Sequence, residues 1–310
     1  MTETTVYTPE EVAKILKISR FTVYEMIKRG DLTAYRIGRK VRVEAPDLEI
    51  YINKSKGLPA AAPAKPYPPD APFAAHDGLI LCGQDIILDI LTKHLEREMP
   101  HIQFLRKYIG SVDGLLSLYR GTANAVTAHL WDSDTDSYNL PYVRHLLPGH
   151  RTLIINLVHR MEGFYVTKGN PKQIHTWQDL ARTGIRFVNR EHGAGARVLL
   201  DEQLRLAGIE HAAIAGYNHE ELSHLAVASC VGRGEADVGL GIEKAALQVL
   251  AVDFIPLKKE RYDLVIRKED MVKPQFQTLL SILRSKSFHN ELAGMGGYDI
   301  SQTGTIIAET

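Results

Sequence analysis

The sequence predicts a two-domain chain, with a small helical head followed by a larger α/β body. Three observations carry this prediction. Residues 57–77 hold six of the fourteen prolines, and proline-rich chain is typical of a semi-rigid spacer. Two short helix patterns and a basic hairpin pattern precede this segment, and strand and helix patterns alternate after it. We therefore expect domains at residues 1–56 and 78–310 joined by a linker at 57–77, which suits a chain of 310 residues.

Composition is that of an ordinary globular protein. The chain has 37 basic and 37 acidic residues, which argues against a uniformly basic nucleic-acid coat. Its two cysteines, Cys82 and Cys230, exclude a disulfide scaffold and a cysteine-rich zinc site. The first residues include an early acid and no apolar run, so a signal peptide is not expected, and no apolar stretch is long enough for a membrane span. We expect a cytosolic protein without cofactor or metal.

The first helix of the head is predicted to begin after Thr8. Thr8 can cap the helix, Pro9 needs no amide donor at its first position, and Glu11 completes a capping box. One apolar stripe follows, formed by Val12, Ile15 and Leu16.

A second helix is predicted at residues 20–29. Ser19 can cap it, Gly30 can end it, and its inward positions are Val23, Met26 and Ile27. Two short helices joined by a tight turn form a helix-turn-helix, and the second has the size that fits the DNA major groove.

Residues 34–43 predict a β-hairpin that turns at Gly38-Arg39. Its basic residues, Arg36, Arg39, Lys40 and Arg42, have no acid among them. The head as a whole has eleven basic and eight acidic residues, so its excess charge is concentrated here. Such a wing can contact DNA phosphates, which supply affinity without sequence preference.

The head resembles the excisionase-type winged helix-turn-helix family. The resemblance covers TPEEVAKILKISRFTVYEMIKRGDLTAYRIGRKVRVEAPDLEIYI, with its Ser-Arg-x-Thr-Val-Tyr recognition helix, Ile-Gly-Arg wing and closing Asp-Leu-x-x-Tyr helix. It implies that Arg20, Thr22 and Tyr24 open the recognition helix, although Tyr24 is equally suited to the core edge. It also implies that Arg39, Lys40 and Arg42 form the wing. We expect double-stranded DNA as partner and a homodimer reading two half-sites.

The body alternates buried-strand and helix patterns. We expect strands at 79–82, 104–109, 123–128, 152–158, 164–167, 185–189, 238–241 and 264–266, with helices between many of them. This alternation implies parallel sheets flanked by helices, with ligands beyond the carboxyl ends of the strands.

Three loops each follow a predicted strand and precede a helix: residues 83–85, 110–111 and 189–197. Glycines let backbone approach a ligand, helix N-termini attract anions, and an arginine can pair with one in forked geometry. We expect a polar or anionic small-molecule site lined by Gly83, Gln84, Ser111, Arg190, Gly193, Gly195, Ala196 and Arg197.

The body resembles the periplasmic-binding-protein-like domain often fused to helix-turn-helix heads. The matching pieces are Tyr108-x-Gly-Ser-x-x-Gly-Leu and residues 139–149, 169–172, 186–190, 197–201, 236–241, 253–257 and 260–264. That domain is similar to molybdate- and tungstate-binding proteins, whose two lobes close over a tetrahedral oxyanion. The resemblance implies a ligand-sensing one-component transcription regulator with an oxyanion effector. Because Gln84, Ala194 and Ala196 stand where relatives often carry hydroxyls, a carboxylate or larger organic ligand is the alternative.

Enzyme activity in the body cleft is the remaining alternative. Cys82 precedes a predicted helix but lies in a buried-strand pattern, which is more typical of a small hydrophobic residue than of a nucleophile. His219 and His224 are five residues apart, which on a helix separates them by about 140° and does not match a zinc-protease pair. Capping and surface polarity explain these histidines better. We therefore expect no catalytic residues.

Overall fold

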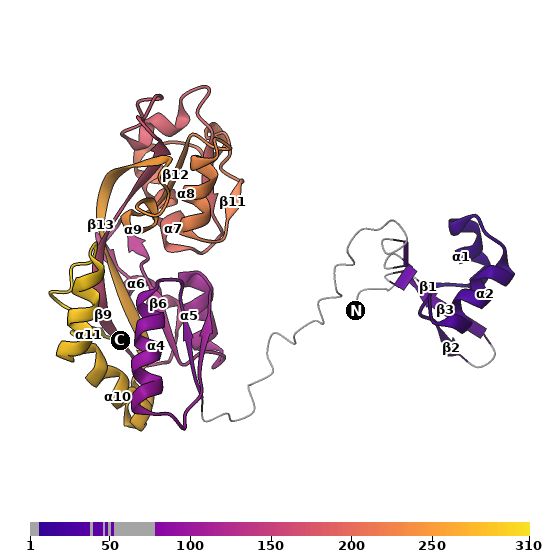
Figure 1. Ribbon diagram of the computed structural model, residues 1–310, viewed down its shortest axis with the longest axis horizontal. Helices are drawn as coiled ribbons and strands as arrows, with labels where there is room; N and C mark the ends of the chain where they lie inside the picture. Colours follow the sequence, from indigo (N-terminus) through magenta and orange to yellow (C-terminus); the bar gives the residue numbers. More distant parts are fainter. Residues whose placement is uncertain (1–5, 38–39, 46, 49–50, 53–77) are drawn as a thin grey trace. The chain divides into compact units, whose positions relative to one another are not determined.

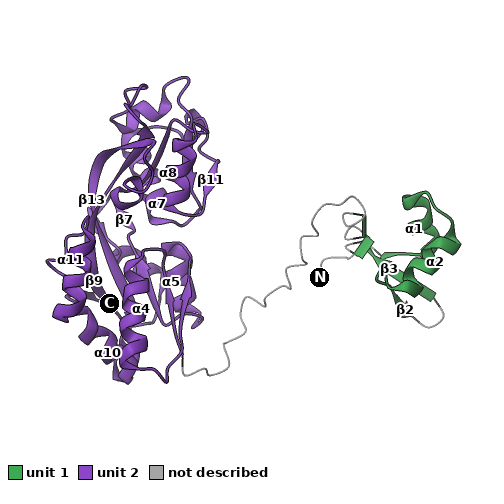
Figure 2. Cartoon of the chain, in the orientation of Figure 1, with its two compact units in different colours: residues 1–71 green, residues 72–310 purple. Residues whose placement is uncertain are grey.

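The computed structural model describes residues 6–37, 40–45, 47–48, 51–52 and 78–310. The chain divides into two compact units, Met1–Ala71 and Pro72–Thr310, which Figure 2 distinguishes by colour. The predicted linker at 57–77 and the wing residues Gly38 and Arg39 lie outside the described residues.

The head combines two capped helices with a small sheet. Its elements are β1 (Val6–Tyr7), α1 (Pro9–Leu16), α2 (Arg20–Arg29), β2 (Tyr35–Ile37) and β3 (Lys40–Glu44), with strand order β1-β3-β2. The capping box of Thr8 and Glu11, the Ser19 cap of α2 and the Gly30 end of α2 are confirmed. The hairpin is confirmed too, because Ile37 pairs with Lys40. Residues 45, 47–48 and 51–52 are helical, where the closing helix is expected.

The predicted apolar stripe of α1 is wrong at one position. Ile15 is 46% exposed, and Ala13 is buried beside Val12 in its place. The core of the head joins these two residues to Val23 and Met26 of α2, and the small Ala13 side chain lets the helices pack closely. Strand β1 was not expected, since two residues are too short to give a pattern.

The body has two lobes on one mixed nine-stranded sheet, in the order β11-β10-β12-β9-β13-β6-β4-β5 with β14 beside β9. The first lobe contains β4 (Leu79–Cys82), α4 (Ile87–Glu98), β5 (Phe104–Lys107), α5 (Ser111–Tyr119), β6 (Ala125–Ala128), α6 (Leu140–Leu146), η3 (Lys268–Val272), α10 (Pro274–Leu283), α11 (Lys286–Met295) and β14 (Ile306–Glu309). The hairpin of β7 (Trp131–Asp132) and β8 (Ser137–Tyr138) follows β6 and packs against the second lobe. The second lobe contains η1 (Trp177–Ala181), β10 (Phe187–Arg190), α7 (Gly195–Ala207), η2 (His211–Ala213), β11 (Glu220–Glu221), α8 (His224–Gly232), β12 (Val238–Ile242) and α9 (Glu243–Ala246).

Two long strands, β9 (Thr152–Thr167) and β13 (Val252–Arg267), run through both lobes (Figure 1). The sequence predicted two separate strands at 152–158 and 164–167 and a short one at 264–266. The polar residues His159, Arg160 and Glu162 resemble a loop, but they lie in strand β9 and pair with β13. The expectation of purely parallel sheets is also corrected. β10 and β12 are parallel, as are β4 and β5, but β9 pairs antiparallel with both β12 and β13.

Each lobe has its own hydrophobic core. Leu81, Leu91 and Phe276 belong to the first, and Phe164, Phe187 and Leu200 belong to the second. Trp131 of the β7–β8 hairpin packs into the second of these cores. Among the described residues, no helix is both long enough and apolar enough to cross a bilayer.

Candidate functional site

Helix α2 presents its N-terminal turn on the surface of the head. Arg20 forms an ion pair with Glu10 at 2.7 Å, and its guanidinium lies over the Tyr24 ring, 5.5 Å from the centroid. The Thr22 hydroxyl lies 2.8 Å from that of Ser19. Phe21, which sequence reasoning did not single out, is 74% exposed. In a helix-turn-helix, the N-terminal residues of the second helix are those that meet base edges.

The wing lies on β2 and β3. Lys40 is exposed, and Arg42 is half-buried with a guanidinium hydrogen bond to the carbonyl of Val41 at 2.9 Å. Arg36 pairs with Val41 in the hairpin register, and Arg39 lies outside the described residues. The backbone therefore places Lys40 and Arg42 on the strand that follows the predicted turn.

In the body, a small cavity lies between the two lobes. Water centres can occupy about 20 Å³ of it, which is room for one or two water molecules or a single compact ion. Its lining comes from three strand-to-helix loops and from the long strands: Gly83, Gln84, Asp85, Ile109, Gly110, Ser111, Thr127, His129, Arg160, Arg190, Ala194, Gly195, His224 and Tyr262.

The three predicted loops meet at this cavity, but not every predicted residue lines it. Gly83, Gln84, Ser111, Arg190 and Gly195 are among the lining residues. The other three lie elsewhere. Gly193 accepts a hydrogen bond from the Val112 amide at 3.0 Å, and Ala196 belongs to the core of the second lobe. Arg197 is buried, pairs with Glu220 and lies over the Tyr217 ring.

The lobes touch each other around the cavity. Besides the Val112–Gly193 bond, Gly195 lies so close to His129 that a Cβ there would be 2.6 Å from the imidazole ring. Gly83, with φ +144°, is similarly confined, because a Cβ would meet the Thr127 hydroxyl at 2.0 Å. The approach of Gly195 to His129 lies between the lobes, which are closed together at this point, whereas Gly83 and Thr127 both belong to the first lobe.

Two helices direct uncapped N-termini at the cavity. α5 begins at Ser111 after Gly110, and α7 begins at Gly195 after Ala194, and neither has a side-chain cap. The first amides of a helix have no partner within it and carry a positive partial charge. Arg190 adds a guanidinium to the same wall and is paired there with Glu191 at 2.7 Å, so it is the two helix N-termini that supply the unpaired positive charge for an anion.

The opposite wall is a buried ionic network that sequence reasoning missed. Arg160 of β9 pairs with both Asp85 and Glu260, and His129 Nδ1 lies 2.6 Å from Glu260 Oε2. The Asp85 carboxylate also accepts hydrogen bonds from the Ile87 amide and the Tyr298 hydroxyl. Because Asp85 and Glu260 already neutralise Arg160, its guanidinium is not available to a bound anion. The only available signal was the group of polar residues inside the apolar run of β9.

Two buried groups adjoin the network. The Nδ1 atom of His224 has no hydrogen-bond partner within the described structure, and the Glu162 carboxyl has none except the Glu260 carboxylate. Burial and the neighbouring Glu260 carboxylate raise the pKa of Glu162 well above its usual range. Burial and the charges of Arg190 and Arg160 hold the pKa of His224 well below its usual range. His224 was expected to be a surface residue and instead lines the cavity.

A wider groove adjoins the cavity. It has room of about 520 Å³ and shares Gln84, Asp85 and His224 with it, while Leu247, Met295 and Tyr298 are among its other lining residues. Cys82 of β4 is buried in the hydrophobic core, and burial raises the pKa of its thiol to about 11. A thiol that is buried and protonated at neutral pH is not an activated nucleophile.

Comparisons with known proteins match both parts of the chain. The family described as "PBP superfamily domain" matches residues 92–284, and a "Helix-turn-helix domain" family matches residues 6–56. The YvgK protein of Bacillus subtilis (strain 168) is 45% identical over 314 residues, covering 100% of both chains. The "Putative DNA-binding protein Rv0500A" of Mycobacterium tuberculosis is 42% identical over 43 residues, 14% of this chain and 55% of its own.

Solved structures similar to the body have binding-protein folds. A Clostridium perfringens chain described as a "Putative Phosphate ABC Transporter Substrate-Binding Protein with Bound Phosphate" has a TM-score of 0.53 at 14% identity, covering 72% of this chain and 98% of its own. The regulatory domain of the LysR-family regulator MetR from N. meningitidis has a TM-score of 0.51 at 13% identity, covering 72% and 98%. At such identities the likeness shows the fold alone.

Proposed function

The chain belongs to the PBP superfamily, and from that membership we propose that it is a transcription regulator whose body binds a small oxyanion and whose head binds double-stranded DNA. The coupling of a helix-turn-helix domain to a binding-protein fold supports ligand-sensing regulation rather than catalysis. In this proposal the chain consists of a DNA-binding head at 1–56, a linker at 57–77 and a ligand-sensing body at 78–310. A DNA-binding role implies a cytoplasmic location.

In the proposed complex, Arg20, Thr22 and Tyr24 of α2 meet the major groove. Arg36, Arg39, Lys40 and Arg42 of the wing contact mainly phosphates. The Arg20–Glu10 ion pair is exposed on both sides, with side chains 60% and 48% accessible, so Arg20 can exchange it for a phosphate at little cost. A single small head gives limited specificity, and we therefore propose a homodimer on two half-sites. Light scattering with and without DNA tests this, and a strict monomer in both conditions would contradict it.

One observation carries the oxyanion proposal: two uncapped helix N-termini and the Arg190 guanidinium converge on one compact cavity. Backbone amides and a forked guanidinium together suit a small tetrahedral anion. The Gln84 amide and the hydroxyls of Ser111 and Thr127 add neutral donors to the same lining. Molybdate and tungstate are the leading ligands.

Thermal unfolding of the full chain with added anions tests the effector. A ligand that binds only the folded state raises the melting temperature with its concentration. Molybdate and tungstate are compared with sulfate, phosphate and carboxylates, and the DNA affinity is measured with each. We expect a shift with an oxyanion that Ser111→Ala and Arg190→Ala both reduce, together with a changed DNA affinity. If no anion shifts the melt and none alters DNA binding, the sensor proposal fails.

A carboxylate-bearing metabolite is the second candidate, favoured by the groove of about 520 Å³ beside the cavity. Its carboxylate would occupy the anion cavity and its remaining atoms the groove. A thermal shift with an organic acid and none with inorganic oxyanions would select this candidate. Replacement of Leu247, which is 72% exposed in the groove, by serine would then weaken the organic ligand and leave oxyanion binding unchanged.

A further inference from the structure

The segment 219–224 has a feature that the anion cavity does not use. It is not a single helix: β11 covers Glu220–Glu221, Ser223 caps α8, and His224 begins that helix. Side chains alternate along extended chain, so His219 and Glu221 lie on one face and Glu220 on the other. Glu220 faces Arg197 and His192, with which it forms ion pairs. His219 and Glu221 are left facing helix α8.

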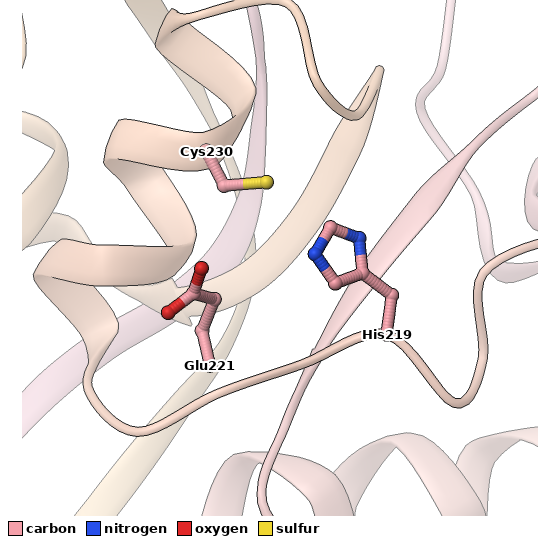
Figure 3. Close-up of side chains that lie close together, drawn as sticks. All are labelled: His219, Glu221 and Cys230. Carbon is pink, nitrogen blue, oxygen red and sulfur yellow. The ribbon is translucent and has the colours of Figure 1, made fainter. Parts of the chain in front are cut away.

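Cys230 of α8 completes the group. Figure 3 shows the His219 ring, the Glu221 carboxylate and the Cys230 sulfur turned toward one another, from the β11 segment and from the helix. One ligand atom from each residue lies within 4.8 Å of the others. Cys230 is fully buried, Glu221 is half-buried and His219 is exposed, so the sulfur is covered by the helix while the histidine side opens to solvent.

We propose that His219, Glu221 and Cys230 form a binding site for Zn²⁺ or a similar transition-metal ion. Imidazole, carboxylate and thiolate are the three protein ligand types of zinc, and three protein ligands with a water completing the tetrahedron is a common arrangement. A thiolate in the set disfavours Mg²⁺ and Ca²⁺, which take oxygen ligands. Glu235 also interacts with the Cys230 thiol, but both its oxygens accept hydrogen bonds from Arg233 at 2.7 Å, so it is not part of the proposed ligand set.

Ion binding at this site requires the Cys230 thiol to lose its proton, because the thiolate is the ligand. The site also adjoins the anion cavity through the backbone, because Arg190 donates to the carbonyl of Glu221 at 3.2 Å.

Cobalt titration of the full-length, reduced and metal-free protein tests the site. Co²⁺ substitutes for Zn²⁺, and a thiolate ligand gives it an intense near-ultraviolet charge-transfer band. We expect this band to saturate at a single ion per chain and to disappear when Zn²⁺ is added. Cys230→Ser should abolish the band, and His219→Ala and Glu221→Gln should each weaken Co²⁺ binding at least tenfold.

Matched controls keep the test specific. Cys82→Ser changes the other buried cysteine, and His175→Ala changes an exposed histidine of the same lobe; both should titrate like the wild type. Because His219 is exposed, His219→Ala leaves the fold intact even if Cys230→Ser does not. The proposal is overturned if the wild type gives no charge-transfer band, if the band survives in Cys230→Ser, or if His219→Ala binds Co²⁺ with unchanged affinity.

Discussion

The Arg190 guanidinium donates to the Gln84 side-chain oxygen at 2.7 Å, across the cleft between the two lobes. Arg190 ends β10 in the second lobe, and Gln84 follows β4 in the first. Glu191 orients the same guanidinium through bonds at 2.7 and 2.8 Å and accepts from the Gln84 amide at 3.2 Å. These three side chains therefore join the two lobes, and two of them, Arg190 and Gln84, also line the cavity.

Arg190→Ala should weaken anion binding by about 10- to 100-fold, since a hydrogen bond to a charged group contributes about 1.5–3 kcal/mol. Gln84→Ala should cause a smaller loss of affinity, because it removes the hydrogen bond between the lobes but leaves the Arg190 charge in the cavity. Calorimetric titration of the ligand identified by the thermal screen measures both. Arg186→Ala, whose exposed side chain pairs with Asp237, is the matched arginine control. Equal affinity in Arg190→Ala and Arg186→Ala would refute this role.

Arg160→Met should destabilise the body strongly. The variant leaves the carboxylates of Asp85 and Glu260 buried without their cation, and breaking a buried pair in this way costs about 3–5 kcal/mol. Urea unfolding measures the loss. Arg151→Met breaks an exposed pair with Glu309 and should cost less than about 1 kcal/mol. The double variant Asp85→Asn/Arg160→Met should recover part of the stability, and similar losses for the two single variants would contradict the account.

His224 should make folding stability fall as pH decreases below about 6.5, the pKa of an unperturbed histidine. Burial and the charges of Arg190 and Arg160 depress its folded-state pKa. Below the unfolded-state pKa, the unfolded chain therefore binds a proton at His224 while the folded protein keeps this histidine neutral. This stability is present above pH 6.5 and is lost at up to about 1.4 kcal/mol per pH unit below it. Urea unfolding between about pH 5 and 7.5 should show a shallower loss in His224→Asn than in the wild type. His175→Ala, an exposed control, should retain the wild-type slope, and an unchanged slope in His224→Asn would exclude this contribution.

Lys40→Ala should weaken DNA binding for all sequences alike. Removing one phosphate contact flattens the plot of log affinity against log salt by about 0.9, and Arg39→Ala should act in the same way. Fluorescence anisotropy at several salt concentrations measures the slope. Lys28→Ala, an exposed charge in the last turn of α2, should leave it unchanged. Full-length protein with no salt-dependent DNA affinity would refute the regulator proposal.

Local signals in the sequence were sufficient for much of this fold. Caps at Thr8 and Ser19 and the strand at 79–82 follow from short-range chemistry, and the structure confirms them. The three loops at the cavity were also predictable, because strand ends and glycines mark them. Arg160, His129 and Glu260 were not, since their partners lie up to 131 residues apart in the chain. Whether a charged residue within a strand is buried depends on which strands pair with it, and that pairing cannot be read from the local sequence.

The chain enters the second lobe along β9 and leaves it along β13, and the far ends of these strands lie side by side, because Thr167 of β9 and Val252 of β13 are register partners. Residues 168–251, between them, are an excursion from these two strands, while the chain from the head connects to the first lobe at β4. This segment can therefore be replaced as a unit, because a different segment inserted between Thr167 and Val252 would leave the pairing of β9 with β13 intact. Changes within residues 168–251 can therefore alter the side of the cavity that contains Arg190 and Gly195 while leaving the lobe connected to the head unchanged.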